Sequence, residues 1–205
     1  MESGIMNLPM VIALIIFSIF SAFVTAKTGY YTPFMLLSPV LISTGAGLIT
    51  TFQPDTPHSQ WIGYQVIYGA GVGMGLQQAF VAVQSALSNF ESDIPIGTSI
   101  ITFSQVIGGA IFISIGQTMF SNKLTTEFTS QVAPLLHGSV GGNLGTIMQK
   151  GATVLKDMLP PDVVPVFLSA YNAALMWPFY VAVALGGFSI FGAMSVEWRR
   201  LDRVG

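Results

Sequence analysis

The stretch from Trp61 to Leu87 reads WIGYQVIYGAGVGMGLQQAFVAVQSAL and contains no charged residue. As an α-helix it would be about 40 Å long, which exceeds the ~30 Å hydrocarbon thickness of a lipid bilayer. Glycine occupies positions 63, 69, 71, 73 and 75 of this stretch. Glycine is unfavourable in a soluble helix, whereas in a membrane it allows neighbouring helix backbones to approach closely. The stretch therefore predicts a membrane-spanning helix with close helix neighbours.

This predicted helix has two faces that carry small or amide side chains. At about 100° per residue, one face holds Gln65, Gly69, Gly73, Gln77, Phe80 and Gln84, and a roughly opposite face holds Gly71, Gly75, Gln78, Ala82 and Ser85. A lipid-facing surface does not require such residues, so we expect protein or water on both sides. Two interpretations remain open. The glycines are packing notches only, with amides that link helices, or Gln77 or Gln84 also lines a polar cavity.

The composition of the whole chain indicates an integral membrane protein. Hydrophobic residues make up 52% and charged residues 8%, against about 25% charged in a typical soluble domain. The apolar segments are long and continuous, unlike the ~10-residue alternating strands of a membrane β-barrel. The predicted fold class is therefore all-α, a polytopic transmembrane bundle.

Several function classes are disfavoured by the same composition. The net charge is −2 without a basic run, which argues against nucleic-acid binding. The chain has no cysteine, and His58 and His137 have no partner at metal-ligand spacing. No predicted span contains a nucleophile–base pair. We therefore expect no enzyme activity, no catalytic or metal-binding residue and no cofactor.

Five spans are predicted along the chain: residues 8–26, 34–52, 61–87, 96–120 and 166–196. Pro39 and Pro178 are expected to bend the spans that contain them. A short turn over 88–95 predicts that the third and fourth spans pack as an antiparallel hairpin. The fourth span repeats the glycine-and-glutamine pattern, with Thr98, Thr102, Gln105, Gly109, Phe112 and Gly116 on one stripe.

Residues 121–165 form the one sizeable polar segment of the predicted topology. Apolar residues at helical spacing, Leu124, Phe128, Val132 and Leu135, predict a short amphipathic helix at its start. Residues 147–159 suggest a second amphipathic helix before Pro160 and Pro161. Positive charge in short loops sets membrane orientation. Arg199, Arg200 and Arg203 predict a cytoplasmic C-terminus, with Lys27 on the same side and residues 121–165 outside.

Several motifs, in this order, resemble a known transporter family. They are Asn7-Leu8-Pro9, the turn from Lys27 to Pro33, Trp61 to Gln65 with the glycine run that follows, and Phe103 to Ala110. Together they resemble the C-terminal part of a major facilitator superfamily (MFS) transporter, and most closely the fungal fourteen-span drug:proton antiporters, which include toxin-efflux pumps. The resemblance implies that residues 1–205 are a partial C-terminal transporter domain with a partial major facilitator fold. Residues 121–165 would be the long outer loop before the last span.

The resemblance also implies a function. Members of this family are typically more than twice as long, so an N-terminal half would be missing here. The implied activity is efflux of small amphiphilic compounds by alternating access, across the plasma membrane or the vacuolar membrane. The predicted spans lack Asp, Glu, Lys, Arg and His, so no proton relay is assigned within them. The substrate-cavity candidates are Gln65, Gln77, Gln84, Gln105 and Phe112, and the helix-packing candidates are Gly69, Gly71, Gly73, Gly75, Gly108 and Gly109.

Two alternatives to an active transporter remain. The polypeptide is a truncated product without transport activity, because half of a rocking pair cannot alternate. Otherwise it is a small membrane protein that binds a full-length transporter through its glycine faces. The expected partners are accordingly the lipid bilayer, a small-molecule substrate, and the missing transporter half or another transporter chain.

Overall fold

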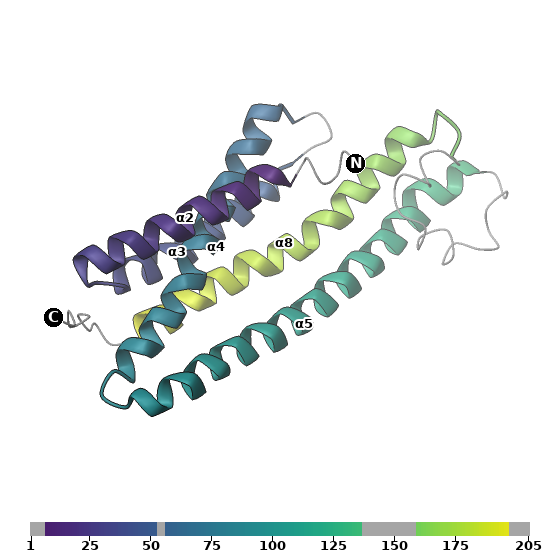
Figure 1. The fold of residues 1–205 in the computed structure, drawn as a ribbon. Coiled ribbons are helices and arrows are strands. Elements are labelled where there is room, and N and C mark those ends of the chain that lie inside the picture. Colours follow the sequence, from purple (N-terminus) through teal and green to yellow (C-terminus); the bar gives the residue numbers. More distant parts are fainter. Residues whose placement is uncertain (1–6, 53–55, 137–158, 197–205) are drawn as a thin grey trace.

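A computed structural model describes residues 7–52, 56–136 and 159–196 of the chain (Figure 1). Its long helices are α2 (Leu8–Thr28), α3 (Thr32–Ile49), α4 (His58–Ala86), α5 (Ile94–Glu127) and α8 (Val164–Met194). Each of these five is long and apolar enough to cross a membrane. The described residues contain no β-strand. The all-α, multi-span architecture predicted from the sequence is therefore confirmed.

The first two helices are joined by a tight turn at Gly29. This glycine has a φ of 75°, and its N–H donates a 2.8 Å hydrogen bond to the Thr25 carbonyl. Positive φ is readily available to glycine and is strained for most other residues. Helix α3 then begins at Thr32, and Pro33 occupies its first turn, where the missing N–H of proline is harmless.

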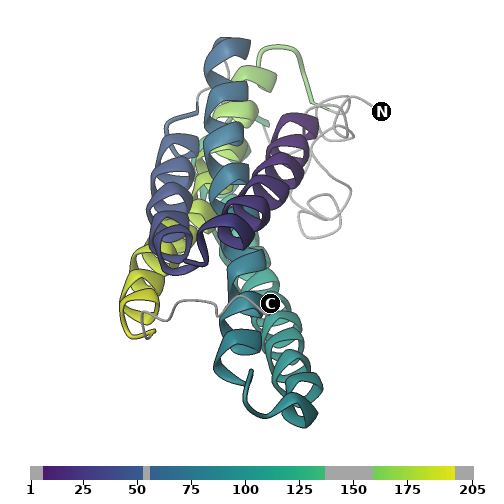
Figure 2. The ribbon, with the colours of Figure 1, turned by 60° about the vertical axis from the view of Figure 1, so that its left-hand side comes forward.

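Helix α4 lies between α2 and α3, as Figure 2 shows. Side chains added at Gly69 and Gly73 would collide with main-chain carbonyls of Met10 and Leu14 on α2. A Cβ at Gly71 would lie 2.7 Å from the Ile42 nitrogen of α3. The alternating glycines thus place backbone against backbone on both sides of α4. We refer to α2, α3 and α4 together as the three-helix unit.

Helix α5 leaves the three-helix unit and runs beside α8 (Figure 1). It contacts α4 near the connecting turn, where a Cβ at Gly97 would lie 2.6 Å from side-chain carbons of Val83 and Leu87. The predicted packing of the third and fourth spans as a hairpin is therefore present near the turn, whereas beyond it α5 packs against α8. The short turn determines only where the two helices meet, and the aromatic contacts at the other end of α5 are with α8.

Helix α5 also extends beyond its predicted end at residue 120. It reaches Glu127 and continues as a π-helical turn, Phe128–Val132, and a 3-10 turn, Ala133–Leu136. The apolar spacing predicted for an amphipathic helix is present, with Leu124, Phe128 and Val132 buried and Leu135 exposed. These residues continue α5 and do not form a separate helix. The second amphipathic helix predicted over 147–159 lies almost entirely outside the described residues.

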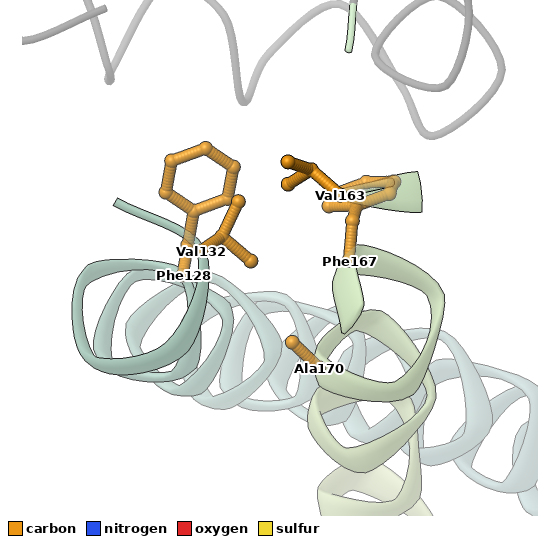
Figure 3. Packing of buried hydrophobic residues seen from close by; sticks show 5 residues of the cluster. All are labelled: Phe128, Val132, Val163, Phe167 and Ala170. Atoms are coloured by element: carbon orange, nitrogen blue, oxygen red, sulfur yellow. The ribbon is translucent and has the colours of Figure 1, made fainter. Parts of the chain in front are cut away.

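A buried apolar cluster joins the end of α5 to the start of α8. Figure 3 shows the side chains pointing toward one another from the two segments, and the cluster comprises Phe128, Val132, Val163, Phe167 and Ala170. The Phe128 and Phe167 rings meet edge to face at 6.3 Å, a favoured geometry for aromatic pairs.

Helix α8 connects this pair to the three-helix unit. The Asn172 amide donates a 2.8 Å hydrogen bond to the Phe52 carbonyl, just after α3. A Cβ at Gly186 would collide with the Ser43 hydroxyl of α3. Helices α3 and α8 continue without interruption through Pro39 and Pro178. Helix α8 therefore packs against α3 on one side and α5 on another.

Candidate functional site

The candidate site is a groove of about 560 Å³ between α5 and α8. Its walls combine aromatic, aliphatic and glycine residues with a single amide, and they comprise Gly109, Phe112, Ile113, Gly116, Gln117, Phe120, Tyr171, Leu175, Pro178, Val181, Ala182 and Leu185. Small-molecule sites in proteins are typically concave and mostly apolar, with few polar groups. Such a groove can accept the apolar or aromatic body of a small compound.

An aromatic pair lies among the residues that line this groove. The Phe120 ring meets the Tyr171 ring edge to face at 5.3 Å. One helical turn further along α5, the Lys123 ammonium lies 5.3 Å from the centre of the Trp177 ring and 3.0 Å from a Glu127 carboxylate oxygen. Lys123, Glu127 and Trp177 are not part of the groove lining, so the groove itself is apolar and aromatic, with Gln117 as its amide.

The structure places the five substrate-cavity candidates on different surfaces. Phe112 lines the groove. Gln65 is buried in the three-helix unit, and its side-chain oxygen has no hydrogen-bond partner among the described residues. Gln77 and Gln84 are exposed on α4, and Gln105 is exposed on α5, outside the groove lining. Within the described chain these five side chains do not form one cavity.

The glycines chosen as packing candidates divide into two groups. Gly69 and Gly73 abut α2, whereas Gly71 and Gly75 abut Ile42 and Ser38 of α3. By contrast, Gly108 and Gly109 have no heavy atom of another described helix within 4 Å. Gly109 instead lies at the edge of the groove. Both glycine pairs on α4 therefore contact a neighbouring helix, whereas the pair on α5 faces open space.

Two polar residues that the sequence reasoning did not select are structurally prominent. Gln117 provides the amide in the groove, and Gln78 is completely buried in the three-helix unit. Gln78 follows Gly71 by seven residues and Gly75 by three, so it shares their helix face. Gln77 lies on the face of Gly69 and Gly73, which also contacts a neighbouring helix, so the sequence contained no signal that distinguished the buried amide from the exposed one.

The described residues show no group of three or more His, Asp or Glu side chains placed to hold a metal ion.

The fold and the groove define a class of protein: a polytopic α-helical membrane protein with an apolar, partly aromatic groove between two spans.

Sequence comparison with curated proteins shows which proteins this chain is similar to. The chain is 46% identical over 197 residues to the MFS-type transporter astH of Aspergillus oryzae, covering 96% of this chain and 33% of the relative. It is 42% identical to the efflux pump roqT of Penicillium rubens, covering 98% of this chain and 36% of the relative. The MFS-type efflux pump MFS1 of Arthroderma benhamiae is 43% identical, with 97% and 35% covered. No family model matches the chain, and no solved structure matches it.

These matches confirm the resemblance seen in the sequence. Nearly the whole chain is homologous to a part of fungal MFS transporters and efflux pumps. The chain spans about a third of the length of these relatives. The relatives are named as transporters and efflux pumps, and together with the five apolar helices they indicate an integral membrane protein.

Proposed function

We propose that this chain is part of an efflux transporter of the major facilitator type. It would move small amphiphilic compounds by alternating access, in which two halves rock around a central site. The single observation that carries the proposal is the outward surface of α5, which joins the groove to a series of polar and small residues. We call this surface the α5 face and define it by Thr102, Gln105, Gly108, Gly109 and Phe112.

The α5 face differs from a lipid-facing surface in its chemistry. The exposed side chains in the middle of α2, such as Ile12, Ile19 and Phe23, are aliphatic or aromatic and suit lipid tails. Gln105 is exposed on the α5 face, and Gly108 and Gly109 have open space above them. Amide and glycine positions are typical of helix interfaces or water-lined cavities in membranes. This contrast supports the proposal that α5 lines a substrate path or contacts the remaining part of the transporter.

The residues would act by binding and not by catalysis. Phe112 would provide aromatic contact to the apolar body of the compound, because it lines the groove. Gln105, on the α5 face, would exchange hydrogen bonds with polar groups of the compound. Gln65, Gln77 and Gln84 on α4 remain the further cavity candidates. Since alternating access needs a second half, the proposed partner is the remaining part of the transporter or another transporter chain.

The proposal is tested with a chimera. The homologous third of the Aspergillus oryzae relative, which is 46% identical, is replaced by this chain. The chimera is expressed in yeast lacking its main drug exporters. We expect it to lower the retention of a fluorescent amphiphilic dye that the unmodified relative exports, whereas this chain alone has no effect. A chimera that reaches the membrane but leaves dye retention unchanged would contradict the proposal.

Two substitutions in the chimera test the α5 face. Phe112→Ala and Gln105→Ala are each expected to slow dye export several-fold. Phe188→Ala is the matched control, because Phe188 is 77% exposed on α8 and outside the groove lining. Unchanged export by both α5 variants, with co-purification of this chain and a full-length transporter, would favour the interaction-partner alternative.

We further propose that the C-terminus is cytoplasmic and that the membrane is the plasma or vacuolar membrane. The support is the C-terminal arginine cluster and Lys27, under the positive-inside rule. The chain has no cysteine, so single cysteines can be labelled without background. In sealed cells, an impermeant maleimide should label Gln60→Cys and should leave Asn89→Cys unlabelled until the cells are permeabilised. The reverse pattern would invert the orientation.

A further inference from the structure

The Thr25 hydroxyl makes an unusual hydrogen bond inside the three-helix unit. Serine and threonine on helices commonly donate to a carbonyl one turn earlier in their own helix, as Thr28 does to Val24 at 2.8 Å. Thr25 instead donates across the helix interface to the Gln78 side-chain oxygen, at 3.3 Å. Thr25 is 2% exposed and Gln78 is 0% exposed. The bond therefore joins α2 to α4 in the interior.

Gln78 has more hydrogen-bonding capacity than Thr25 can satisfy. A glutamine amide offers two N–H donors and an oxygen with two acceptor sites. In the described chain the Gln78 nitrogen is buried and has no partner. If the amide oxygen and nitrogen were exchanged, the nitrogen would donate to Thr25 and the oxygen would lose its partner. In either orientation one end of the buried amide has no protein partner.

The surroundings of Gln78 are polar but contain few available groups. Gln78 follows Gly75, which abuts Ser38 of α3, so it lies where α4 meets both neighbours. Ser38 already donates to the Gly71 carbonyl at 2.8 Å. The hydroxyls of Thr25 and Ser38 are therefore both engaged as donors, and the Gln78 nitrogen is left without a protein partner at this junction.

The electrostatics of this junction favour a neutral ligand. Residues 8–26 of α2 and 59–86 of α4 contain no charged side chain. The closest charge in the α2 sequence is Lys27, two residues after Thr25, and its ammonium lies 5.1 Å from the Phe23 ring. A cation at this depth would need an opposite charge, and the neighbouring charge is itself positive. An anion would likewise have a single neutral amide as its donor.

We infer that Gln78 and Thr25 hold a buried water molecule at the junction of α2, α3 and α4. Water is neutral, small, and able to donate and accept. Its oxygen accepts the Gln78 N–H that has no protein partner, and its hydrogens are available to the buried oxygens of the junction. Buried waters typically make about three such bonds to polar groups that would otherwise be unsatisfied. The inference does not depend on the transport function proposed above.

Water contact can be detected directly on the unmodified chain. The chain is labelled with ¹⁵N-glutamine and placed in detergent micelles, and magnetisation transfer from water to each side-chain amide is recorded by NMR. Laboratory-frame and rotating-frame measurements separate dipolar contact from chemical exchange by the sign of the signal. We expect the Gln78 amide to show dipolar transfer from a long-lived water.

Two variants assign and test the signal. Gln78→Met should remove it, whereas Gln77→Met, at the exposed neighbour, should leave it unchanged. Thr25→Val should shift the Gln78 resonance and weaken the transfer several-fold, which also assigns the signal if Gln78→Met does not fold. A Gln78 amide without dipolar transfer, in a spectrum where buried waters elsewhere are detected, would overturn the inference and leave a dry, unsatisfied amide.

Discussion

The three-helix unit and the α5–α8 pair are built from similar residues but pack in different ways. In the three-helix unit, Gly69, Gly71 and Gly73 bring α4 into backbone contact with α2 and α3. In the pair, Gly108 and Gly109 meet nothing, and α5 is held to α8 mainly at its end by aromatic rings. Identical residue types thus serve as contact surfaces in one region and as an open surface in the other.

This difference shows that a glycine-rich helix face does not by itself predict contact with a neighbouring helix. A glycine stabilises a helix pair only where a partner backbone occupies the space that a side chain would fill. On α4 both faces have such a partner within the chain. On α5 the partner would have to come from outside the described chain, which is why we assign that face to a substrate path or to the rest of a transporter.

The largest expected effect on stability is at the aromatic end of the pair. Phe167→Ala removes a fully buried ring and should lower the free energy of unfolding by about 3–5 kcal/mol. Unfolding in mixed micelles, followed by circular dichroism, would measure it. The control Phe188→Ala should change the free energy by less than about 0.5 kcal/mol, and equal losses would mean that the cluster does not hold the pair.

The next effect compares the two kinds of glycine directly. Gly73→Ala introduces a methyl group against the Leu14 backbone, so we expect a loss of about 1–3 kcal/mol from overpacking. Gly108→Ala adds the same group in open space and should stabilise the helix by up to about 1 kcal/mol. The same unfolding assay applies to both. If the two variants changed stability in the same direction and by the same amount, the contrast between the regions would fail.

A smaller effect is expected where α8 joins the three-helix unit. Asn172→Leu removes the hydrogen bond to the Phe52 carbonyl and should cost about 0.5–1.5 kcal/mol. Ser169→Ala is the matched control, because its exposed hydroxyl bonds only within α8, to the Val166 carbonyl. A loss for Ser169→Ala as large as that for Asn172→Leu would show that the link between the regions is not at Asn172.

The smallest effect concerns an ion pair near the end of α5. Glu127→Gln breaks the ion pair with Lys123 one turn earlier on α5, and such pairs typically contribute about 0.3–0.5 kcal/mol. Both side chains are partly exposed, at 32% and 16%, and salt screens such charges in part, so the difference between variant and wild type should become smaller in 1 M salt. A difference that persisted in high salt would indicate that the pair is shielded from solvent.

Some elements were predictable from the sequence because they depend on local properties. The uncharged stretch Trp61–Leu87 matches α4 closely, since partition into lipid depends on the composition of the segment itself. The turn after α2 was equally readable, because Gly29 and Pro33 have local backbone preferences. The buried spacing of Leu124, Phe128 and Val132 was also recognised, although their continuity with α5 was not.

The candidate site was less predictable because it depends on helix rotation and on neighbours. Gln77 and Gln78 are adjacent and chemically identical, yet Gln77 is exposed and Gln78 is completely buried. The sequence reasoning selected Gln77. The groove forms between α5 and α8, with Phe112 on one wall and Tyr171 on the other. The short turn over 88–95 indicated α4, and not α8, as the neighbour of α5.

The sequence by itself determined that this protein is a bundle of five long apolar helices and which family it resembles. Only the tertiary structure decided that α5 pairs with α8, that α4 is enclosed by α2 and α3, and that Gln78 is the buried amide. The physical reason is that membrane insertion depends on the composition of each segment. Helix pairing depends instead on the fit between surfaces far apart in the chain, which no local pattern encodes.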